Sequence, residues 1–308
     1  MEHIPVLLEK SIDGLKIKPA GIYVDGTLGR GGHTLEIVKK LKTGKLVAID
    51  YDTEAIKETK KKLSGYKDKI TYIHGNFKDT AQLLKNINIT SIDGAIFDLG
   101  VSSPQLDDKS RGFSYQTDAR LDMRMDKSQS VRAYDLVNTL NEEDLCKILR
   151  DYGEERYARL IARQIIKKRS ISHIETTFQL NDIIIKAIPA AARREKQHPS
   201  KRSFQALRIA VGDELGALKK TLDTVPYILN PGGRICIISF HSLEDRIVKK
   251  AFAYYSSECT CSKDIPVCIC NKNQLLKTIT KKPVVVSAFE AENNPRARSA
   301  KLRIAEKI

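Results

Sequence analysis

The stretch Ile22–His33, IYVDGTLGRGGH, constrains the fold more than any other part of this 308-residue chain. It begins with a short apolar run, Ile22–Val24, which is typical of a buried strand. Asp25 closes the run, and Gly26, Gly29, Gly31 and Gly32 follow within seven residues. Glycine allows a sharp turn and a close approach of bare backbone to a ligand. Because Thr34–Leu41 has apolar residues at helical spacing, the stretch predicts strand, glycine turn and helix N-terminus, the usual place for a nucleotide-like ligand.

Two acidic residues narrow the class of that ligand. A second predicted strand, Lys45–Ile49, ends at Asp50, about twenty residues beyond the loop, where a carboxylate can bind both hydroxyls of a ribose. Asp25 closes the first strand, directly before the glycine loop, where it would repel a pyrophosphate and suit a cationic amino-acid ligand. S-adenosylmethionine, with its ammonium and sulfonium groups, is such a ligand. The loop therefore predicts a methyltransferase, with phosphate-binding and dinucleotide folds as the alternatives.

Strands and helices alternate on both sides of a long helical stretch. Strands are expected at 22–24, 45–49, 70–73, 92–97, 234–240 and 300–305. Helices are expected at 5–15, 52–63, 81–84, 133–140, 142–152, 154–169, 178–188, 204–229 and 247–255. This order predicts an α/β fold with an open, Rossmann-like parallel sheet and right-handed crossovers, interrupted by an all-helical insertion. The expected domains are 1–110 and 203–308, which share the sheet, and the insertion 111–202.

Charge suggests a polyanionic partner. The net charge is +15, and residues 156–202 contain twelve Lys and Arg against three Asp and Glu. On the helix expected at 154–169, one face carries Arg156, Arg159, Arg163 and Lys167. This face and the basic residues of 193–202 indicate a nucleic-acid phosphate track, or else a solvated surface. No apolar run is long enough for a membrane span and no secretion signal is apparent, so a cytoplasmic protein without a membrane partner is expected.

Four of the six cysteines form two close pairs, Cys259-x-Cys261 and Cys268-x-Cys270. Clustered cysteines in a cytosolic chain indicate a metal site more often than disulfides. The pairs are tighter than the usual C-x₂-C zinc knuckle, so structural zinc and reduced surface thiols both remain open. No catalytic metal ligands are expected. Cys146 and Cys236 lie in apolar patterns and are expected in the core.

Seven motifs, spread over essentially the whole chain, together resemble one family. They are DGTLGRGGH (25–33), DLGVSSPQLD (98–107), RGFSY (111–115), LDMRMD (121–126), YGEERYA (152–158), SFHSLEDRIVK (239–249) and NPRARSAKLRIAEK (294–307). In this order they resemble the RsmH (MraW) family of bacterial 16S ribosomal RNA cytosine N4-methyltransferases. The resemblance implies a class I methyltransferase fold with a helical insertion and S-adenosylmethionine as cofactor. It also implies a cytosine of the decoding region in the small ribosomal subunit as target.

The resemblance also implies a set of cofactor contacts. Carried over by motif, these are Gly31, Gly32, His33, Asp50, Phe77, Asp98 and Gln105. Phe77, at the end of the third predicted strand, is expected either against the adenine ring or in the core. Neither the charge pattern nor the resemblance predicts an oligomeric state, or whether free RNA or an assembled subunit is the substrate.

The reacting base is expected beyond the fourth strand. Many amino-group methyltransferases have an Asn/Asp/Ser-Pro-Pro-aromatic motif there, whereas this chain has Ser102-Ser103-Pro104-Gln105, so the roles of that motif do not transfer. Ligands lie beyond the carboxyl ends of parallel strands. We hypothesise that Asp98 and the Ser102–Pro104 turn hold the cytosine amine, with His241 and Ser242 as the other wall. Alternatively, Asp98 only caps the turn and contacts the cofactor.

Two other classes of function share part of the pattern. A nicotinamide-dependent oxidoreductase would have the same strand, glycine loop and acid, but gives no reason for a basic insertion. A non-catalytic RNA-binding assembly factor would keep the basic surface, yet its cofactor loop would be free to decay. Because the glycine loop, Asp50 and Asp98 are all present, we prefer the interpretation that the chain is an S-adenosylmethionine-dependent N4-methyltransferase.

Overall fold

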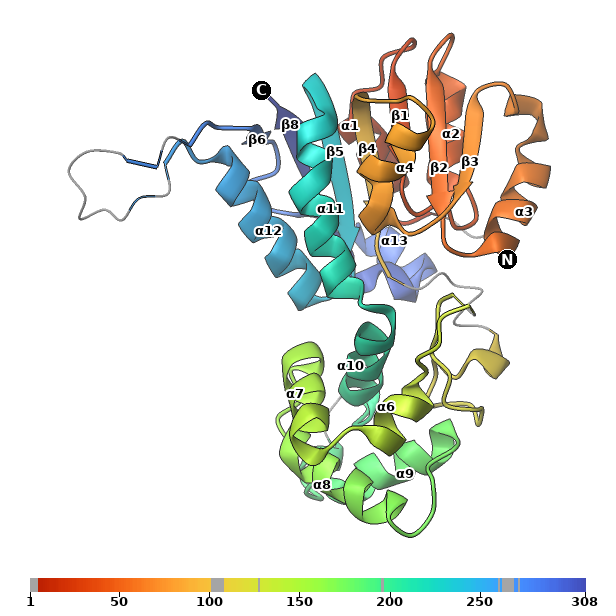
Figure 1. The fold of residues 1–308 in the computed structure, drawn as a ribbon, viewed down its shortest axis with the longest axis vertical. Helices are drawn as coiled ribbons and strands as arrows, with labels where there is room; N and C mark the ends of the chain where they lie inside the picture. The colour runs from red at the N-terminus through yellow and green to blue at the C-terminus, as the bar shows by residue number, and fades with distance from the viewer. Residues whose placement is uncertain are drawn as a thin grey trace. The chain divides into compact units, whose positions relative to one another are not determined.

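The computed structural model describes residues 5–100, 108–126, 128–194, 197–259, 261, 269–270 and 272–308. The chain forms two compact units: residues 1–100 with 215–308, and residues 101–214 (Figure 1). The predicted turn Ser102–Gln105 and Cys268 lie outside the described residues. Within the described part of the chain, no helix has the length and apolar character needed to cross a membrane.

The first unit contains one sheet with the strand order β3-β2-β1-β4-β5-β8-β6, and β7 pairs with β8. Its strands are β1 (Ile22–Asp25), β2 (Lys45–Asp50), β3 (Ile70–His74), β4 (Ile92–Asp98), β5 (Leu229–Ser239), β6 (Leu276–Thr278), β7 (Val284–Val285) and β8 (Lys301–Lys307). Strands β1 to β5 are parallel, and β8 runs antiparallel between β5 and β6. The prediction of an α/β fold with a Rossmann-like parallel sheet is confirmed.

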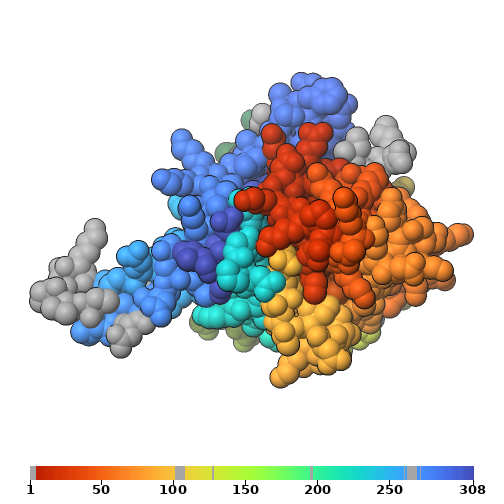
Figure 2. All heavy atoms as spheres, turned by 90° about the horizontal axis from the view of Figure 1, so that it is seen from above, coloured from red at the N-terminus to blue at the C-terminus, as the bar shows by residue number. Residues whose placement is uncertain are grey.

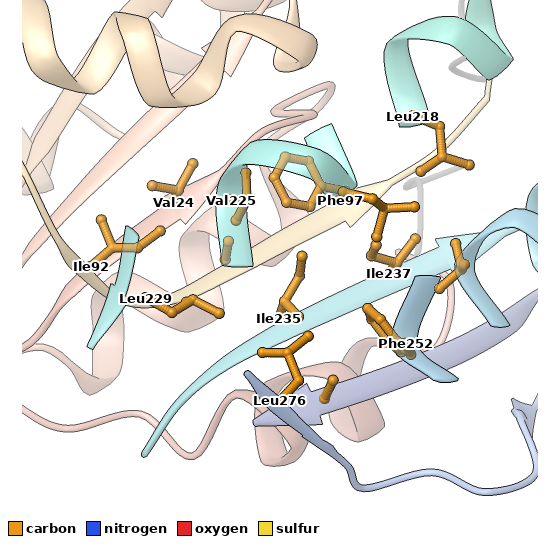
Figure 3. Packing of buried hydrophobic residues seen from close by; sticks show 14 of the residues in the cluster. Val24, Ile92, Phe97, Leu218, Val225, Leu229, Ile235, Ile237, Phe252 and Leu276 are labelled. Atoms are coloured by element: carbon orange, nitrogen blue, oxygen red, sulfur yellow. The ribbon is translucent and has the colours of Figure 1, made fainter. Parts of the chain in front are cut away.

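Helices cover both faces of this sheet. They are α1 (Leu8–Leu15), α2 (Gly32–Lys40), α3 (Thr53–Lys62), α4 (Thr80–Asn86), α11 (Glu214–Ile228), α12 (Ser242–Ser256) and α13 (Ala288–Asn293). On one face, Val225 of α11 and Phe252 of α12 belong to one apolar cluster with Phe97 and Ile237 of the sheet (Figure 3). On the other, α1 and α2 pack on a separate apolar cluster that includes Leu46 and Ile96. Strands buried on both faces explain the continuous apolar runs of the sequence.

Within its described residues, the regular secondary structure of the second unit is mainly helical. Its helices are α6 (Ala133–Thr139), α7 (Glu142–Gly153), α8 (Ala158–Arg169), α9 (Thr177–Ala187) and α10 (Lys201–Gly212). Before α6, the buried Arg111 side chain donates to the carbonyls of Arg124 and Met125 at 2.7 and 2.9 Å. The motifs RGFSY and LDMRMD are therefore in contact, and the hydrogen bonds of Arg111 between them stabilise this unit.

Several predicted helices differ in extent from the observed ones, and two of the differences have a clear backbone cause. The helix expected at 204–229 is two helices, because Asp213 adopts a left-handed conformation with φ 47° that ends α10. The helix expected from 154 begins only at Ala158, because Glu154, with φ 48°, is the C-cap of α7. Left-handed residues end helices in this way, but the usual signal is glycine. An acidic residue in that conformation gives no such signal in the sequence.

Candidate active site

The glycine loop joins β1 to α2 as predicted. Leu28 N–H donates to the Ile49 carbonyl at 3.0 Å, which places the loop over the end of β2. Gly29 and Gly31 have φ of 47° and 70°, and a left-handed backbone favours glycine at both positions. Helix α2 then begins at Gly32, so its unsatisfied N–H groups lie at the carboxyl edge of the sheet. This is the strand, turn and helix N-terminus that the sequence predicts.

Two carboxylates at this edge accept hydrogen bonds from the loop. Asp25, the last residue of β1, accepts from Thr34 Oγ1 at 2.7 Å and from Thr27 N–H at 3.2 Å. Asp50, the last residue of β2, accepts from Gly29 N–H at 2.8 Å and from Asp52 N–H at 2.9 Å. Both side chains are buried. The predicted ribose-binding acid therefore also holds the glycine loop in position.

A third carboxylate, Asp98, ends β4. Its backbone N–H donates to Thr27 Oγ1 at 2.6 Å, and its Oδ2 lies 4.0 Å from Nδ1 of the buried His33. Its Oδ1 is also buried and has no hydrogen-bond partner among the described residues. A buried oxygen of this kind is costly unless a ligand satisfies it. Asp98 therefore offers an acceptor to a bound molecule.

Burial raises the pKa of all three carboxyl groups. The pKa of Asp25 and that of Asp50 are each raised to about 6, mainly because burial disfavours the charged form. Burial, the charge of Asp25 and that of Glu244 raise the pKa of Asp98 well above its ordinary value. In the described part of the chain, no Lys or Arg forms an ion pair with any of the three. Buried carboxylates without a cation nearby form a site for a positively charged ligand.

His241 and Glu244 interact with each other at the end of β5. His241 is the N-cap of α12, and its Nδ1 accepts from Glu244 N–H at 3.4 Å. Glu244 Oε2 accepts from Phe240 N–H at 2.8 Å, and Glu244 Oε1 lies 3.1 Å from His241 Nε2. Both ring nitrogens of His241 therefore face Glu244. His241 therefore caps α12, while its buried Nε2 has no hydrogen-bond partner among the described residues, and its contact with a substrate stays a prediction.

Phe77 packs against the sheet. Its ring centroid lies 6.1 Å from that of Phe97, and the side chain, which is half-buried, contacts the core cluster beside α11. This contact favours the core interpretation of Phe77. Whether the ring also contacts an adenine stays a prediction.

The structure brings most of the predicted cofactor residues to one edge of one unit. Gly31, Gly32 and His33 lie at the start of α2, and Asp50 and Asp98 end β2 and β4. Ser102, Ser103, Pro104 and Gln105 lie outside the described residues. Sequence reasoning missed Thr27, Thr34 and Glu244. The position of Thr27 and Thr34 beside the glycine loop was a signal that could have found them. The effect of the Glu244 charge on the Asp98 pKa could not be found in this way, because the tertiary fold brings the two residues together.

The basic residues of the second unit are exposed where they lie on α8. Arg159, Arg163 and Lys167 follow at intervals of four on the solvent face, opposite the buried Ile161 and Ile165. Arg156 precedes the helix and, with His198 and Arg202, lines a small hollow. Arg163 also lies 3.6 Å from Glu142. The exposed guanidinium and ammonium groups are available to an anionic polymer.

Comparison with known proteins gives consistent matches over the whole chain. The model of the MraW methylase family matches residues 1–308. "Ribosomal RNA small subunit methyltransferase H" of Halothermothrix orenii is 55% identical over 100% of this chain and 99% of the relative. The protein of the same name from Clostridioides difficile is 51% identical over 99% of each chain. A solved rRNA methylase from Streptococcus thermophilus covers 100% of this chain and 99% of its own, with a TM-score of 0.45 and 12% identity. From the family match and the two close relatives, this chain belongs to the MraW methylase family.

Proposed function

We propose that this protein transfers a methyl group from S-adenosylmethionine to N4 of a cytosine in the decoding region of 16S ribosomal RNA. The two close relatives are named as methyltransferases of small-subunit ribosomal RNA. The observation that carries the proposal is a set of three carboxyl groups at the edge beside the glycine loop: Asp25 and Asp50, which are buried, and Asp98, which is partly exposed but whose Oδ1 is buried. They fit a cationic ligand, and they would repel the pyrophosphate of a nicotinamide cofactor.

The residues of the first unit fit S-adenosylmethionine, which supplies a methyl group on a sulfonium when bound. Asp50 would hold the ribose, and the N-terminus of α2 with Gly31, Gly32 and His33 would border the cofactor. The Asp25 carboxylate, on the other side of the glycine loop, would stabilise the positive charge of the cofactor. A cation bound at this edge would lower the pKa of the Asp98 carboxyl, because an opposite charge favours the ionised form.

The ionised Asp98 side chain would then accept a hydrogen bond from the cytosine amine. The lone pair of this amine is delocalised into the ring, so an acceptor that holds the N–H groups favours the pyramidal, nucleophilic form. As the N4–CH₃ bond forms and the S–CH₃ bond breaks, N4 gains positive charge and its proton becomes acidic. Asp98 or water can take that proton, so no strong base is required. Positioning and electrostatic stabilisation supply most of the acceleration.

The exposed cations of the second unit would hold the RNA backbone. We assign this role to Arg159 and Lys167 on α8 and to the basic hollow lined by Arg156 and Arg202. Phosphate contacts orient an RNA without reading its sequence. The target base would be extruded toward the carboxyl edge of the sheet, as in other enzymes that modify a base.

Methyl transfer tests this proposal directly. The full-length protein, labelled S-adenosylmethionine, and either small ribosomal subunits or naked 16S ribosomal RNA would be incubated, and the modified nucleoside identified by mass spectrometry. N4-methylcytidine supports the proposal. A label on another base, or no transfer to either substrate, contradicts it.

Asp98→Asn tests the role of the carboxylate. The substitution keeps the shape but replaces one acceptor by a donor that opposes the amine. Single-turnover transfer at saturating cofactor should fall by about 10²-fold or more, the scale of one misplaced polar group at a reacting centre. Asp68→Asn, at an exposed turn before β3, is the matched control. Near-normal transfer by Asp98→Asn would leave Asp98 as a turn and cofactor residue only.

A further inference from the structure

Three cysteine sulfurs meet in the segment between α12 and β6. Cys259 and Cys261 follow the end of α12, and Cys270 precedes β6. The Sγ atoms of all three lie within 4.8 Å of one another. Cys259 and Cys261, together with Cys270 eleven residues after Cys259, therefore form one cluster of soft thiolate ligands.

The spacing of the sulfurs matches metal coordination better than a disulfide. Cys270 Sγ lies 3.8 Å from Cys259 Sγ. A disulfide requires about 2.05 Å. In a tetrahedral zinc site with Zn–S bonds of about 2.3 Å, the edge between two sulfurs is about 3.8 Å. The separation of Cys259 and Cys270 therefore fits two thiolates that share one tetrahedral ion.

Described residues beside the cluster are exposed to solvent. Ile269, next to Cys270, is 71% exposed. The described residues that follow α12 and precede β6 extend away from the sheet of the first unit (Figures 1 and 2). Exposed residues of this kind contribute little apolar burial, so another source of free energy is needed to hold the cysteines together. Metal binding commonly supplies that free energy in small loops.

Polar contacts close the base of the segment. The Lys272 ammonium donates to the carbonyls of Tyr254 and Ser257, and to Ser257 Oγ at 2.8 Å. Its Nζ also lies 4.6 Å from the centroid of the Tyr254 ring. Lys272 thereby joins the end of α12 to the chain that follows Cys270. This lowers the loop-closure cost of bringing the cysteines together.

We propose that Cys259, Cys261 and Cys270 bind a structural zinc ion. Thiolate sulfur selects zinc over magnesium or calcium, and tetrahedral sulfur coordination is typical of zinc or iron. Cys268 lies outside the described residues, so the site stands on the other three sulfurs. The site is separate from the carboxylates that border the glycine loop, and it does not depend on the proposed methyl transfer.

Metal analysis of the full-length protein tests the site. Protein expressed with added zinc and purified under reducing conditions without chelators should contain about one zinc per chain. A thiol-specific mercurial should release this zinc to an indicator dye. Replacement by cobalt should give the visible absorption bands and the thiolate charge-transfer band of tetrahedral sulfur coordination.

Serine variants locate the ligands. Cys261→Ser and Cys270→Ser should reduce bound zinc to background, whereas Cys146→Ser, in α7 of the other unit, should keep it. S-adenosylmethionine affinity of each variant reports whether the first unit still folds. The cobalt spectrum of the wild type tests the site even if a variant is unstable. Absence of zinc, retention of zinc by both ligand variants, iron in place of zinc, or a disulfide found by mass spectrometry would overturn the assignment.

Discussion

The backbone N–H of Asp98 donates to Oγ1 of Thr27 over 2.6 Å. The two residues are 71 positions apart in sequence, and the bond ties the end of β4 to the glycine loop that follows β1. Thr27 N–H in turn donates to Asp25 Oδ1 at 3.2 Å. One threonine therefore couples two of the carboxylates at the candidate cofactor site.

Thr27→Val should weaken both the fold and the site. The valine keeps the shape but leaves the Asp98 N–H without its acceptor, which costs about 1–3 kcal/mol for a buried donor. Thermal or denaturant unfolding measures this loss, and single-turnover transfer should also fall because Asp98 is less well positioned. Thr27→Ser keeps the hydroxyl and should stay near the wild type. Equal behaviour of the two variants would rule out the hydroxyl as the cause.

Asp50→Ala should lower both cofactor affinity and stability. The carboxylate accepts from Gly29 N–H and Asp52 N–H, and it is the proposed partner of the ribose. Loss of hydrogen bonds to a charged acceptor corresponds to about 1.5–3 kcal/mol of binding free energy. Calorimetry with S-adenosylmethionine measures it.

Asp52→Asn is the matched control for Asp50→Ala. Asp52 caps α3 by accepting from Glu54 N–H at 3.0 Å, and asparagine is an equally good N-cap. This variant should bind the cofactor normally. If Asp50→Ala also binds normally, Asp50 holds the loop but does not contact the ribose.

Cofactor affinity should depend on pH through the buried carboxyl groups. With pKa values of about 6, Asp25 and Asp50 are largely protonated at pH 5 and ionised at pH 7.5. A cationic ligand favours the ionised forms, so S-adenosylmethionine affinity should rise over this range. S-adenosylhomocysteine lacks the sulfonium charge and should show a shallower rise. Equal slopes for the two ligands in calorimetry would contradict charge pairing at this edge.

Ligand-free stability should change in the opposite direction. The folded-state pKa of Asp25 and Asp50 is raised above the ordinary 3.8, so the folded state binds more protons between about pH 4 and 6. The free energy of unfolding contributed by these groups therefore falls as pH rises through that window, by at most about 3 kcal/mol for each carboxyl. Denaturant titrations of the wild type and of Asp25→Asn should differ in this slope. Identical slopes would show that Asp25 does not titrate there.

Removing the exposed cations of α8 should weaken RNA binding. Arg159→Ala with Lys167→Ala leaves the Arg163–Glu142 contact in place. Substrate affinity should fall, and the slope of log K against log salt should decrease by roughly one unit for each lost phosphate contact. S-adenosylmethionine affinity should not change.

Lys60→Ala with Lys61→Ala removes the same charge from the exposed end of α3 and serves as the control. If both double variants weaken binding equally, the effect comes from net charge. If neither does, the α8 face is only solvated.

Much of the fold follows from local patterns in the sequence. Ile22–Asp25, Lys45–Asp50 and Ile92–Asp98 are apolar runs closed by an acid, and the residues after the first are a glycine turn and an amphipathic helix. Side-chain periodicity and glycine conformational freedom act within a few residues, so they are readable without tertiary structure. Because parallel strands end at the same edge, the meeting of Asp25, Asp50 and Asp98 could also be predicted.

The tertiary structure alone decided the features that depend on distance between remote residues. The hydrogen bond from Asp98 N–H to Thr27 and the influence of Glu244 on the Asp98 pKa each join separate elements. The left-handed Asp213 that separates α10 from α11 belongs with them, since aspartate is a much weaker local signal for that conformation than glycine. Hydrogen bonds and charge coupling fall off steeply with distance. Their strength is set by packing, which the periodicity of a sequence does not contain.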